Sequence, residues 1–331
     1  MHPEAGPLDG ISFLLMWTAV AIYALAFIAY AFDLAKRSQL SLERADAKVL
    51  VAAGGVDTQT IAPGLQAMHA AEDRRNQVFA RIGTVLTVLG WLFHLAGTVL
   101  RGIAAGRVPW SNMYEFAMTG TLLVIAVYLG VQFWRDLRFL GTFMVGLVTV
   151  LMGAATLYHV DVVPLADPLR SVWLIVHVFV ASLATAFLAL AFGLSVLQLL
   201  QARRERLELA AAGSEAAPKR SFLRTLPTAE ALEGLAYRFA IIGFIFWTFT
   251  LIAGSIWAQD AWGRYWGFDT KEVWTFIIWV LYAGYIHARA TRGWRGTRSA
   301  WLSIVGFTAV IFNFTIVNQF FQGLHAYSGL S

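Results

Sequence analysis

A segment from Trp257 to Trp274 gathers aromatic and charged side chains more densely than crossing a membrane requires. Four tryptophans, a tyrosine and a phenylalanine are interleaved here with two glycines: Trp257, Trp262, Gly263, Tyr265, Trp266, Gly267, Phe268 and Trp274. An interfacial aromatic belt accounts for one or two such tryptophans but not for four. Flat rings beside glycines favour contact with the face of a large apolar ligand, and Arg264 and Lys271 are placed to bind carboxylates. A porphyrin with two propionates fits this description.

Histidines are the second group of candidates, because a neutral imidazole is the usual axial ligand of haem iron and is costly to leave unpaired in hydrocarbon. His177 and His325 are predicted on the same membrane face as the tryptophan-rich segment. His94 and His287 lie within predicted spans, where each is either a haem-related residue or a buried histidine bonded to a neighbouring helix. The other three histidines are predicted to be ordinary tail or loop residues: His2, His69 and His159.

Cysteine is absent from the sequence. This composition excludes disulfides, cysteine-ligated zinc or iron–sulfur centres, a CxxC redox pair and a CxxCH haem-attachment motif on this chain. Any thiol chemistry connected with its function must therefore belong to a partner.

The elements that position these residues are predicted from hydropathy. The 331-residue chain is 58% hydrophobic and 14% charged, whereas soluble domains carry about 25% charged residues. A helix needs about 20 apolar residues to cross the hydrocarbon of a bilayer. Eight runs of that order are Ile11–Phe32, Ile82–Leu100, Met113–Phe133, Phe139–Leu157, Val172–Leu200, Phe239–Trp257, Val273–Ala288 and Ala300–Phe321. The sequence predicts an all-α, polytopic transmembrane helix bundle of about eight spans.

The basic residues are distributed unevenly over the connections between these spans. Twenty of the 25 Lys and Arg residues lie in four connections, 33–81, 134–138, 201–238 and 289–299. The five others lie on the opposite side: Arg101, Arg107, Arg170, Arg264 and Lys271. Because cytoplasmic loops are rich in Lys and Arg, we expect both termini to be extracytoplasmic. The net charge of +5 then has a topological cause, and no nucleic-acid partner is expected.

The connections also suggest a domain organisation. Residues 1–200 form an N-terminal part of five spans, which includes a cytoplasmic loop at 33–81 with a short helix around Gln66–Phe79. A cytoplasmic linker follows at 201–236, where Gly213, Pro218 and Pro227 interrupt helix formation. Residues 237–331 form a C-terminal part of three spans with the extracytoplasmic tryptophan-rich loop 258–274.

Two span entrances carry helix-capping patterns. Ser111 or Asn112 is expected to cap the span that begins near Met113, and Glu115 closes a capping box if Asn112 is the cap. Asp269 and Glu272 are placed to cap the following helix in the tryptophan-rich segment. A carboxylate at a span entrance, such as Glu115, is also a candidate for proton transfer or for positioning a ligand group.

These residues together resemble a known family. Residues 262–272, followed by 279–289, are similar to the tryptophan-rich "WWD" signature of haem-handling proteins. Further matches lie at 109–116, 171–178 and 323–327. In detail the chain resembles the CcsA/ResC family of the cytochrome c synthesis system in bacteria and plastids. Phe268 stands where this signature commonly has tryptophan, and Thr270 where it commonly has proline.

The resemblance implies a haem-handling subunit of a membrane cytochrome c synthase, in a plasma or thylakoid membrane. Haem b would move from the cytoplasmic side and be presented outside for thioether attachment to the CxxCH cysteines of apocytochrome c. It also implies a CcsB/ResB-type partner and thiol-reducing thioredoxin-like proteins.

The resemblance assigns roles to individual residues as well. His177 and His325 would be the axial ligands of an outer haem iron, and His287 would ligate an inner haem within the membrane. The haem-presenting surface would consist of Trp262, Trp266, Asp269 and Trp274. The partner would supply the second ligand of the inner haem, so His94 would be a neighbouring or transit residue.

Two other functions remain open at this point. A b-type dihaem membrane cytochrome that transfers electrons from quinol would also use paired histidines, although these usually face one another at similar depths. A transporter of another aromatic solute would leave the histidine positions unexplained.

Overall fold

The computed structural model describes residues 5–52, 58–165, 167–211, 221–291, 293–321 and 323–324. Every regular element in these ranges is helical, which confirms the all-α prediction. The α-helices are α1 (Ala5–Ala52), α2 (Thr58–Ala105), α3 (Met113–Val131), α4 (Gly141–Ala155), α5 (Val172–Ala210), α6 (Ala229–Trp262), α7 (Thr270–Ala290), α8 (Thr297–Phe312) and α9 (Asn318–Phe320). A π-helical turn, Asn313–Val317, joins α8 to α9.

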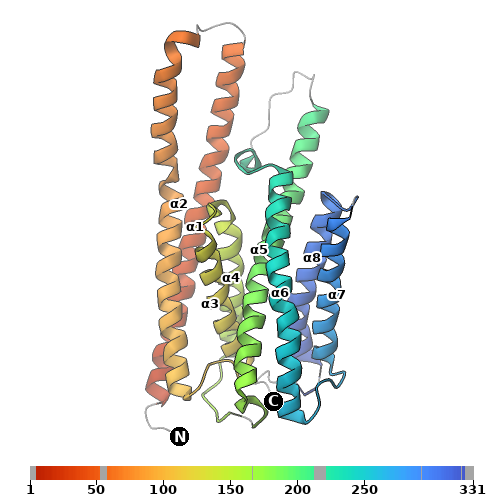
Figure 1. Cartoon of the computed structure of the whole chain (residues 1–331). Coiled ribbons are helices and arrows are strands. Elements are labelled where there is room, and N and C mark those ends of the chain that lie inside the picture. The colour runs from red at the N-terminus through yellow and green to blue at the C-terminus, as the bar shows by residue number, and fades with distance from the viewer. Residues whose placement is uncertain are drawn as a thin grey trace.

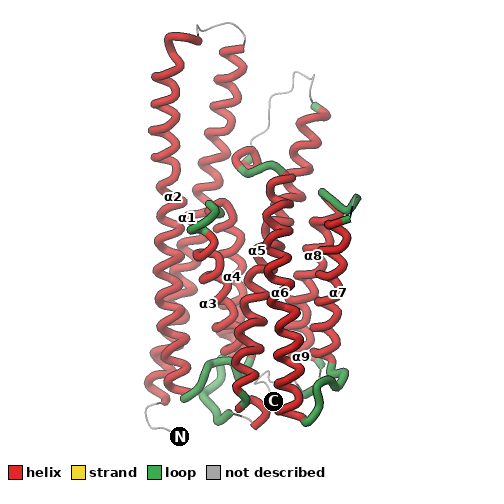
Figure 2. Tube along the Cα trace, viewed as in Figure 1, coloured by secondary structure: helices red, strands yellow, loops and turns green. Residues whose placement is uncertain are grey.

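The long helices stand side by side in a bundle with nearly parallel axes (Figure 1). The α1–α2 pair lies at one edge, α3 and α4 follow, then α5 and α6, and α7 and α8 form the other edge. The connections 106–112, 159–165 and 263–269 all lie at one end, where Figure 2 shows loops. We call this end the shelf end, because it carries the tryptophan-rich segment.

Seven of the described helical segments are long and apolar enough to cross a membrane by length and composition. This confirms a multi-pass membrane protein. The predicted seventh span lies within α7, which is not among the seven. Its 21 residues rise through about 31 Å beside α6 and α8. Polar and charged residues at both of its ends, including Lys271, Glu272 and Arg289, lower its hydropathy.

The predicted loop at 33–81 is largely helical, and the short helix expected around Gln66–Phe79 lies within α2. The structure instead continues α1 to Ala52 and begins α2 at Thr58, so both helices extend past the rest of the bundle (Figure 1). The extension is rich in Ala, Leu, Glu, Lys and Arg, which favour helix. A membrane span is already a formed helix, so adding such residues to its end requires no new helix nucleation and is favourable. The α5 helix likewise continues to Ala210, and α6 begins at Ala229.

The α1–α2 pair is held by large side chains seated on glycines. Three residues of α1 spaced seven apart meet three glycines of α2 with the same spacing, in antiparallel order: Met16 on Gly97, Tyr23 on Gly90 and Tyr30 on Gly83. A Cβ atom at each of these glycines would lie 2.9 Å from the facing side chain. Close approach at small residues is the usual way in which membrane helices associate.

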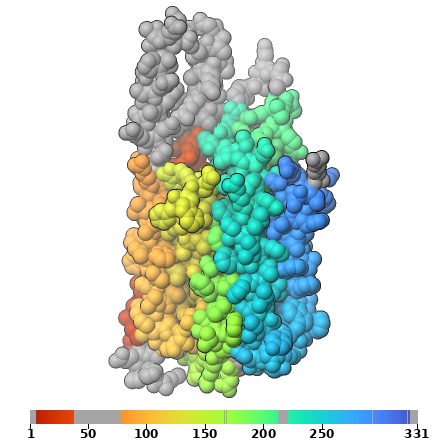
Figure 3. Space-filling model, viewed as in Figure 1, coloured from red at the N-terminus to blue at the C-terminus, as the bar shows by residue number. Residues whose placement is uncertain are grey.

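Apolar side chains also cover the outside of the bundle. Leu25, Val85 and Ile245 are each more than half exposed. Figure 3 shows the outer faces of α2 and α6 on one side of the molecule. Such surfaces suit contact with lipid, because hydrocarbon is the solvent at that depth.

Candidate functional site

A cavity of about 200 Å³ lies among α3, α4, α5, α6, α7 and α8 toward the shelf end. Its walls are mainly apolar, with Trp247 and Phe307 among them. A smaller cavity of about 80 Å³ lies beside it, under Tyr265 and Trp266. The two cavities share five lining residues: His177, Thr250, Trp257, Lys271 and Thr275. An imidazole and an ammonium group therefore stand at the junction of two apolar spaces.

His177 is held flat against α6. Ser171 caps α5 by accepting a hydrogen bond from the Trp173 backbone N–H (3.1 Å), and its hydroxyl donates to Asp260 on α6 (2.9 Å). A Cβ atom at Gly254 would lie 2.7 Å from the His177 ring, so only glycine lets the ring approach this closely. The ring stacks on Trp257 with a centroid distance of 5.8 Å and an interplanar angle of 21°.

The tautomer of His177 follows from one hydrogen bond. Nδ1 lies 3.0 Å from the backbone carbonyl oxygen of Thr250, which can only accept, so Nδ1 carries the proton. Nε2 of the neutral ring then carries the lone pair. Donation from one ring nitrogen to a carbonyl is the arrangement that orients metal-ligating histidines. The Thr250 carbonyl therefore fixes the orientation of the His177 ring.

The tryptophans of the shelf segment divide into three groups. Trp262 packs edge-on against Trp257 at 4.8 Å and so stands near His177. Trp266 contacts Phe276 and Phe268 edge-on and lines the smaller cavity. Trp274 instead packs 4.5 Å from Phe312 on α8 and lines neither cavity. Of the predicted haem-presenting tryptophans, Trp266 lines the smaller cavity, Trp262 contacts the cavity-lining Trp257, and Trp274 packs against α8.

Asp269 and Glu272 cap α7 as predicted, with both reciprocal bonds of a capping box. Glu272 accepts hydrogen bonds from the backbone N–H groups of Gly267 (2.8 Å) and Asp269 (3.1 Å). Asp269 Oδ1 also accepts from the backbone N–H of Leu324 (3.1 Å). The C-terminal segment is therefore tied to the shelf one residue before His325, which itself lies outside the described residues.

The two histidines predicted inside spans lie away from this site. His94 is fully buried between α1, α2 and α3, where its Nε2 lies 2.8 Å from the carbonyl oxygen of Met118 and its Nδ1 lies 3.3 Å from the hydroxyl of Tyr23. His287 is exposed near the far end of α7, roughly 21 Å along the helix from Val273. The structure does not bring either residue to the shelf cavities.

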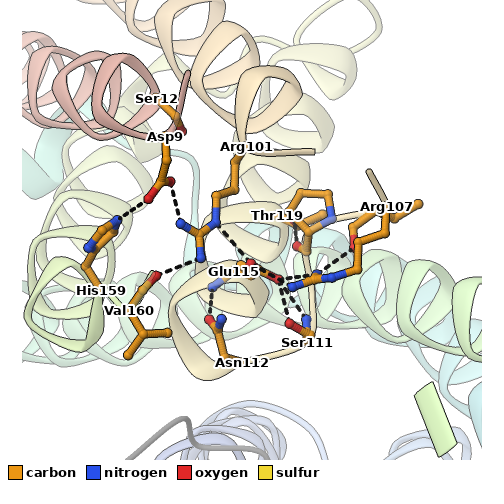
Figure 4. Close-up of polar contacts among 12 residues, drawn as sticks. Asp9, Ser12, Arg101, Arg107, Ser111, Asn112, Glu115, Thr119, His159 and Val160 are labelled. Atoms are coloured by element: carbon orange, nitrogen blue, oxygen red, sulfur yellow. Dashed lines mark hydrogen bonds and ion pairs between the residues drawn. The ribbon is translucent and has the colours of Figure 1, made fainter. Parts of the chain in front are cut away.

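Glu115 lies in a buried ionic network beside the larger cavity (Figure 4). It accepts hydrogen bonds from Arg101 Nε (3.0 Å), from the Arg107 guanidinium (2.6 and 3.2 Å) and from the Ser111 hydroxyl and backbone N–H (3.0 and 2.9 Å). The side chains of Arg101 and Glu115 are both fully buried. Asn112 caps α3, accepting from the Glu115 N–H at 2.9 Å. Glu115 thus bonds Ser111 instead of closing the predicted capping box.

The same network reaches residues that sequence reasoning did not connect. Arg101 forms an ion pair with Asp9 at the start of α1 and donates to the carbonyl oxygen of Val160 (2.8 Å). Asp9 in turn lies 3.4 Å from His159. Figure 4 shows these groups converging from α1, α2, α3 and the loop before α5. The network therefore joins α1, α2, α3 and the loop before α5 at the shelf end.

Asn313 and Asn318 are site residues that the sequence analysis missed. Both line the larger cavity, although residues five apart on an α-helix point in different directions. The π-helical turn Asn313–Val317 widens the helix there and brings them to one side, and such turns are frequent at functional sites. The sequence signal that could have identified these residues is the presence of two amide side chains within an otherwise apolar span.

Comparisons with known proteins identify the family of this chain. Residues 110–325 match the family model described as "Cytochrome C assembly protein". The chain belongs to this cytochrome c assembly family. The matched range contains His177, the shelf segment, His287 and His325, whereas His94 and Arg101 precede it.

Relatives of this cytochrome c assembly family member are similar over most of their length. The chain is 32% identical over 262 residues to the cytochrome c biogenesis protein CcsA of Trieres chinensis, which covers 72% of this chain and 83% of the relative. It is 33% identical over 269 residues to CcsA of Guillardia theta, covering 78% and 88%. The identity to CcsA of Gloeobacter violaceus is 31% over 306 residues, covering 79% and 90%.

Proposed function

We propose that this protein is the haem-handling subunit of a membrane cytochrome c synthase. The observation that carries the proposal is His177, whose Nδ1–H is committed to the Thr250 carbonyl while its ring borders two apolar cavities and stacks on Trp257. A flat apolar macrocycle with a central metal matches these features. The family membership and the CcsA relatives support a role in cytochrome c biogenesis.

The second axial ligand in this proposal is His325. Its neighbour Leu324 is bonded to Asp269 at the start of α7, which brings the segment close to the shelf. Bis-histidine ligation would hold the iron of haem b, and the rings of Trp262 and Trp266 would orient the porphyrin. The shelf end would then present the haem vinyl groups to an incoming apocytochrome c.

The chemistry at the shelf end requires positioning more than catalysis by a side chain of this protein. Each cysteine thiol of CxxCH adds across a vinyl double bond: the sulfur bonds one carbon, the proton goes to the other, and no group leaves. Holding thiol and vinyl together converts an encounter between two molecules into a step within one complex. Because the chain has no cysteine, the thiols must come from the apocytochrome, with thioredoxin-like proteins keeping them reduced.

His287 would serve a separate haem station within the membrane. It lies exposed on α7 near the end opposite the shelf, where a ligand from a CcsB/ResB-type partner can approach. With the shelf end outside the cytoplasm, haem would pass from His287 toward His177. His94 has a structural role in this proposal, because hydrogen bonds already engage both of its ring nitrogens.

Haem content and cytochrome c yield test the proposal. We expect His177→Ala and His325→Ala to abolish cytochrome c maturation, and added imidazole to restore part of it by replacing the missing ligand. His287→Ala should lower total haem and reduce the amount of haem that reaches the site of His177 and His325. His325→Ala should leave the inner haem in place. Full maturation in His177→Ala without imidazole would refute the ligand assignment.

The b-type cytochrome predicts a different outcome. It requires a stoichiometric haem pair that quinol reduces, with ligands facing one another inside the bundle. In the structure, His94 is surrounded by α1, α2 and α3, whereas His287 lies exposed on α7. Absorbance of the purified protein before and after quinol addition separates the two functions.

A further inference from the structure

Lys271 occupies the first turn of α7 and lines both shelf cavities together with His177. Its Nζ donates a hydrogen bond to the side-chain oxygen of Asn318, which extends from beyond the π-helical turn. Asn318 is itself fixed, since its Nδ2 donates to the carbonyl oxygen of Phe314 (2.8 Å). The ammonium group therefore has a defined position at the junction of the two cavities.

The charge of Lys271 is not matched by an ion pair. The ion pairs found among the described residues do not include it. Asn318 is a neutral acceptor, and the adjacent Glu272 is bonded to the backbone of the shelf loop. Asp269 attracts the ammonium at longer range, but it caps α7 and accepts from Leu324. A cation in largely apolar surroundings is costly unless it is paired.

A second unsatisfied polar group lies in the wall of the same cavity. The side-chain oxygen of Asn313 is buried and accepts no hydrogen bond from the described residues, while its Nδ2 donates to Thr275 (3.3 Å). Thr275 lies one helical turn after Lys271, and its hydroxyl donates to the Lys271 carbonyl (2.7 Å). Polar groups on this side of the cavity thus converge where Lys271 stands.

We propose that Lys271 binds a propionate carboxylate of the haem whose iron His177 ligates. This inference rests on the proposed function and names the residue that recognises the acidic edge of the ligand. The unpaired ammonium supplies charge, Asn318 holds it in place, and His177 borders the same cavities. Recognition of a carboxylate would orient the porphyrin, so that its apolar edge faces the tryptophans.

Binding of two porphyrins to the full-length protein tests this assignment. The probes are iron protoporphyrin IX and its dimethyl ester, which keeps the iron and the vinyl groups but has no free carboxylate. Protein from haem-depleted cells is titrated in a neutral detergent, and binding is followed by haem absorbance. A hydrogen bond to a charged group is worth enough to expect that the wild type prefers the diacid about tenfold or more.

Substitutions at Lys271 should change this preference selectively. Lys271→Met should bind both porphyrins equally, with the affinity for the ester unchanged, and Lys271→Arg should keep the preference. Arg170→Gln is a matched control, because it removes one exposed positive charge at the same end of the bundle. Its preference should equal that of the wild type.

Each outcome decides between the proposals. An unchanged preference in Lys271→Met, or an equal loss of both porphyrins in Lys271→Met and Lys271→Gln, overturns the carboxylate assignment. If Arg170→Gln also loses the preference for the diacid over the ester, the preference reflects the general charge of the protein, and the Lys271 assignment is overturned. If the wild type binds neither porphyrin, the proposed function fails; if it binds both through His177 without preference, only the Lys271 assignment fails.

Discussion

Replacing Glu115 by glutamine should destabilise the bundle strongly. The side chain is fully buried and accepts five hydrogen bonds from Arg101, Arg107 and Ser111. Glutamine has nearly the same shape but carries no charge, and its amide nitrogen would face donors that it cannot accept from. Two guanidinium groups would then remain in the bundle with their shared carboxylate removed.

The expected cost follows from the burial of the network. Breaking a buried ion pair by removing one partner costs about 3–5 kcal/mol, because the remaining charge is left uncompensated. That is a large share of the about 5–15 kcal/mol that stabilises a typical protein. The Asp136–Arg138 pair at 2.5 Å offers a matched comparison, since the Asp136 side chain is 59% exposed. Asp136→Asn should cost only about 0–1 kcal/mol.

Unfolding of the purified protein in detergent micelles measures both effects on one scale. The double variant Glu115→Gln/Arg101→Met should lose less than the sum of the single variants, because removing both charges leaves one fewer unpaired group. If Glu115→Gln and Asp136→Asn lower the free energy of unfolding equally, or if the Glu115 and Arg101 effects simply add, the network does not stabilise the bundle as argued.

Two further predictions concern the shelf and the orientation of the chain. Asp269→Ala should lower cytochrome c yield several-fold, because it releases Leu324. Asp269→Asn keeps an acceptor oxygen and should retain most of the yield. Equal yields from the two variants would contradict a role for the Asp269–Leu324 hydrogen bond. The chain has no cysteine, so single cysteines can be introduced at two exposed positions, Asp167→Cys at the shelf end and Leu209→Cys near the end of α5. An impermeant maleimide applied to intact cells should label the first variant and not the second. The reverse pattern would invert the proposed topology.

Hydropathy and local motifs were sufficient to predict the helical bundle. The apolar runs are determined within about 20 residues, because each helix satisfies its own backbone hydrogen bonds in hydrocarbon. The cap of α7 was predictable for a similar reason, since Asp269 and Glu272 are three residues apart. Of the helical extensions through 33–52 and 58–81, only the part around Gln66–Phe79 was predicted, because their polar residues carry no span signal and their helicity depends on the adjoining spans.

The sequence by itself determined which residue types were available for the site: the histidines, the shelf tryptophans and the charges at span ends. Only the tertiary structure decided which of them meet. Asp9 and Arg101 are 92 positions apart, and Lys271 and Asn318 are 47 apart. Such contacts depend on the rotation and depth of each helix and on a π-helical turn, which no local pattern specifies. The proton on His177 is likewise placed by Thr250 of another helix, because its carbonyl accepts the Nδ1–H bond.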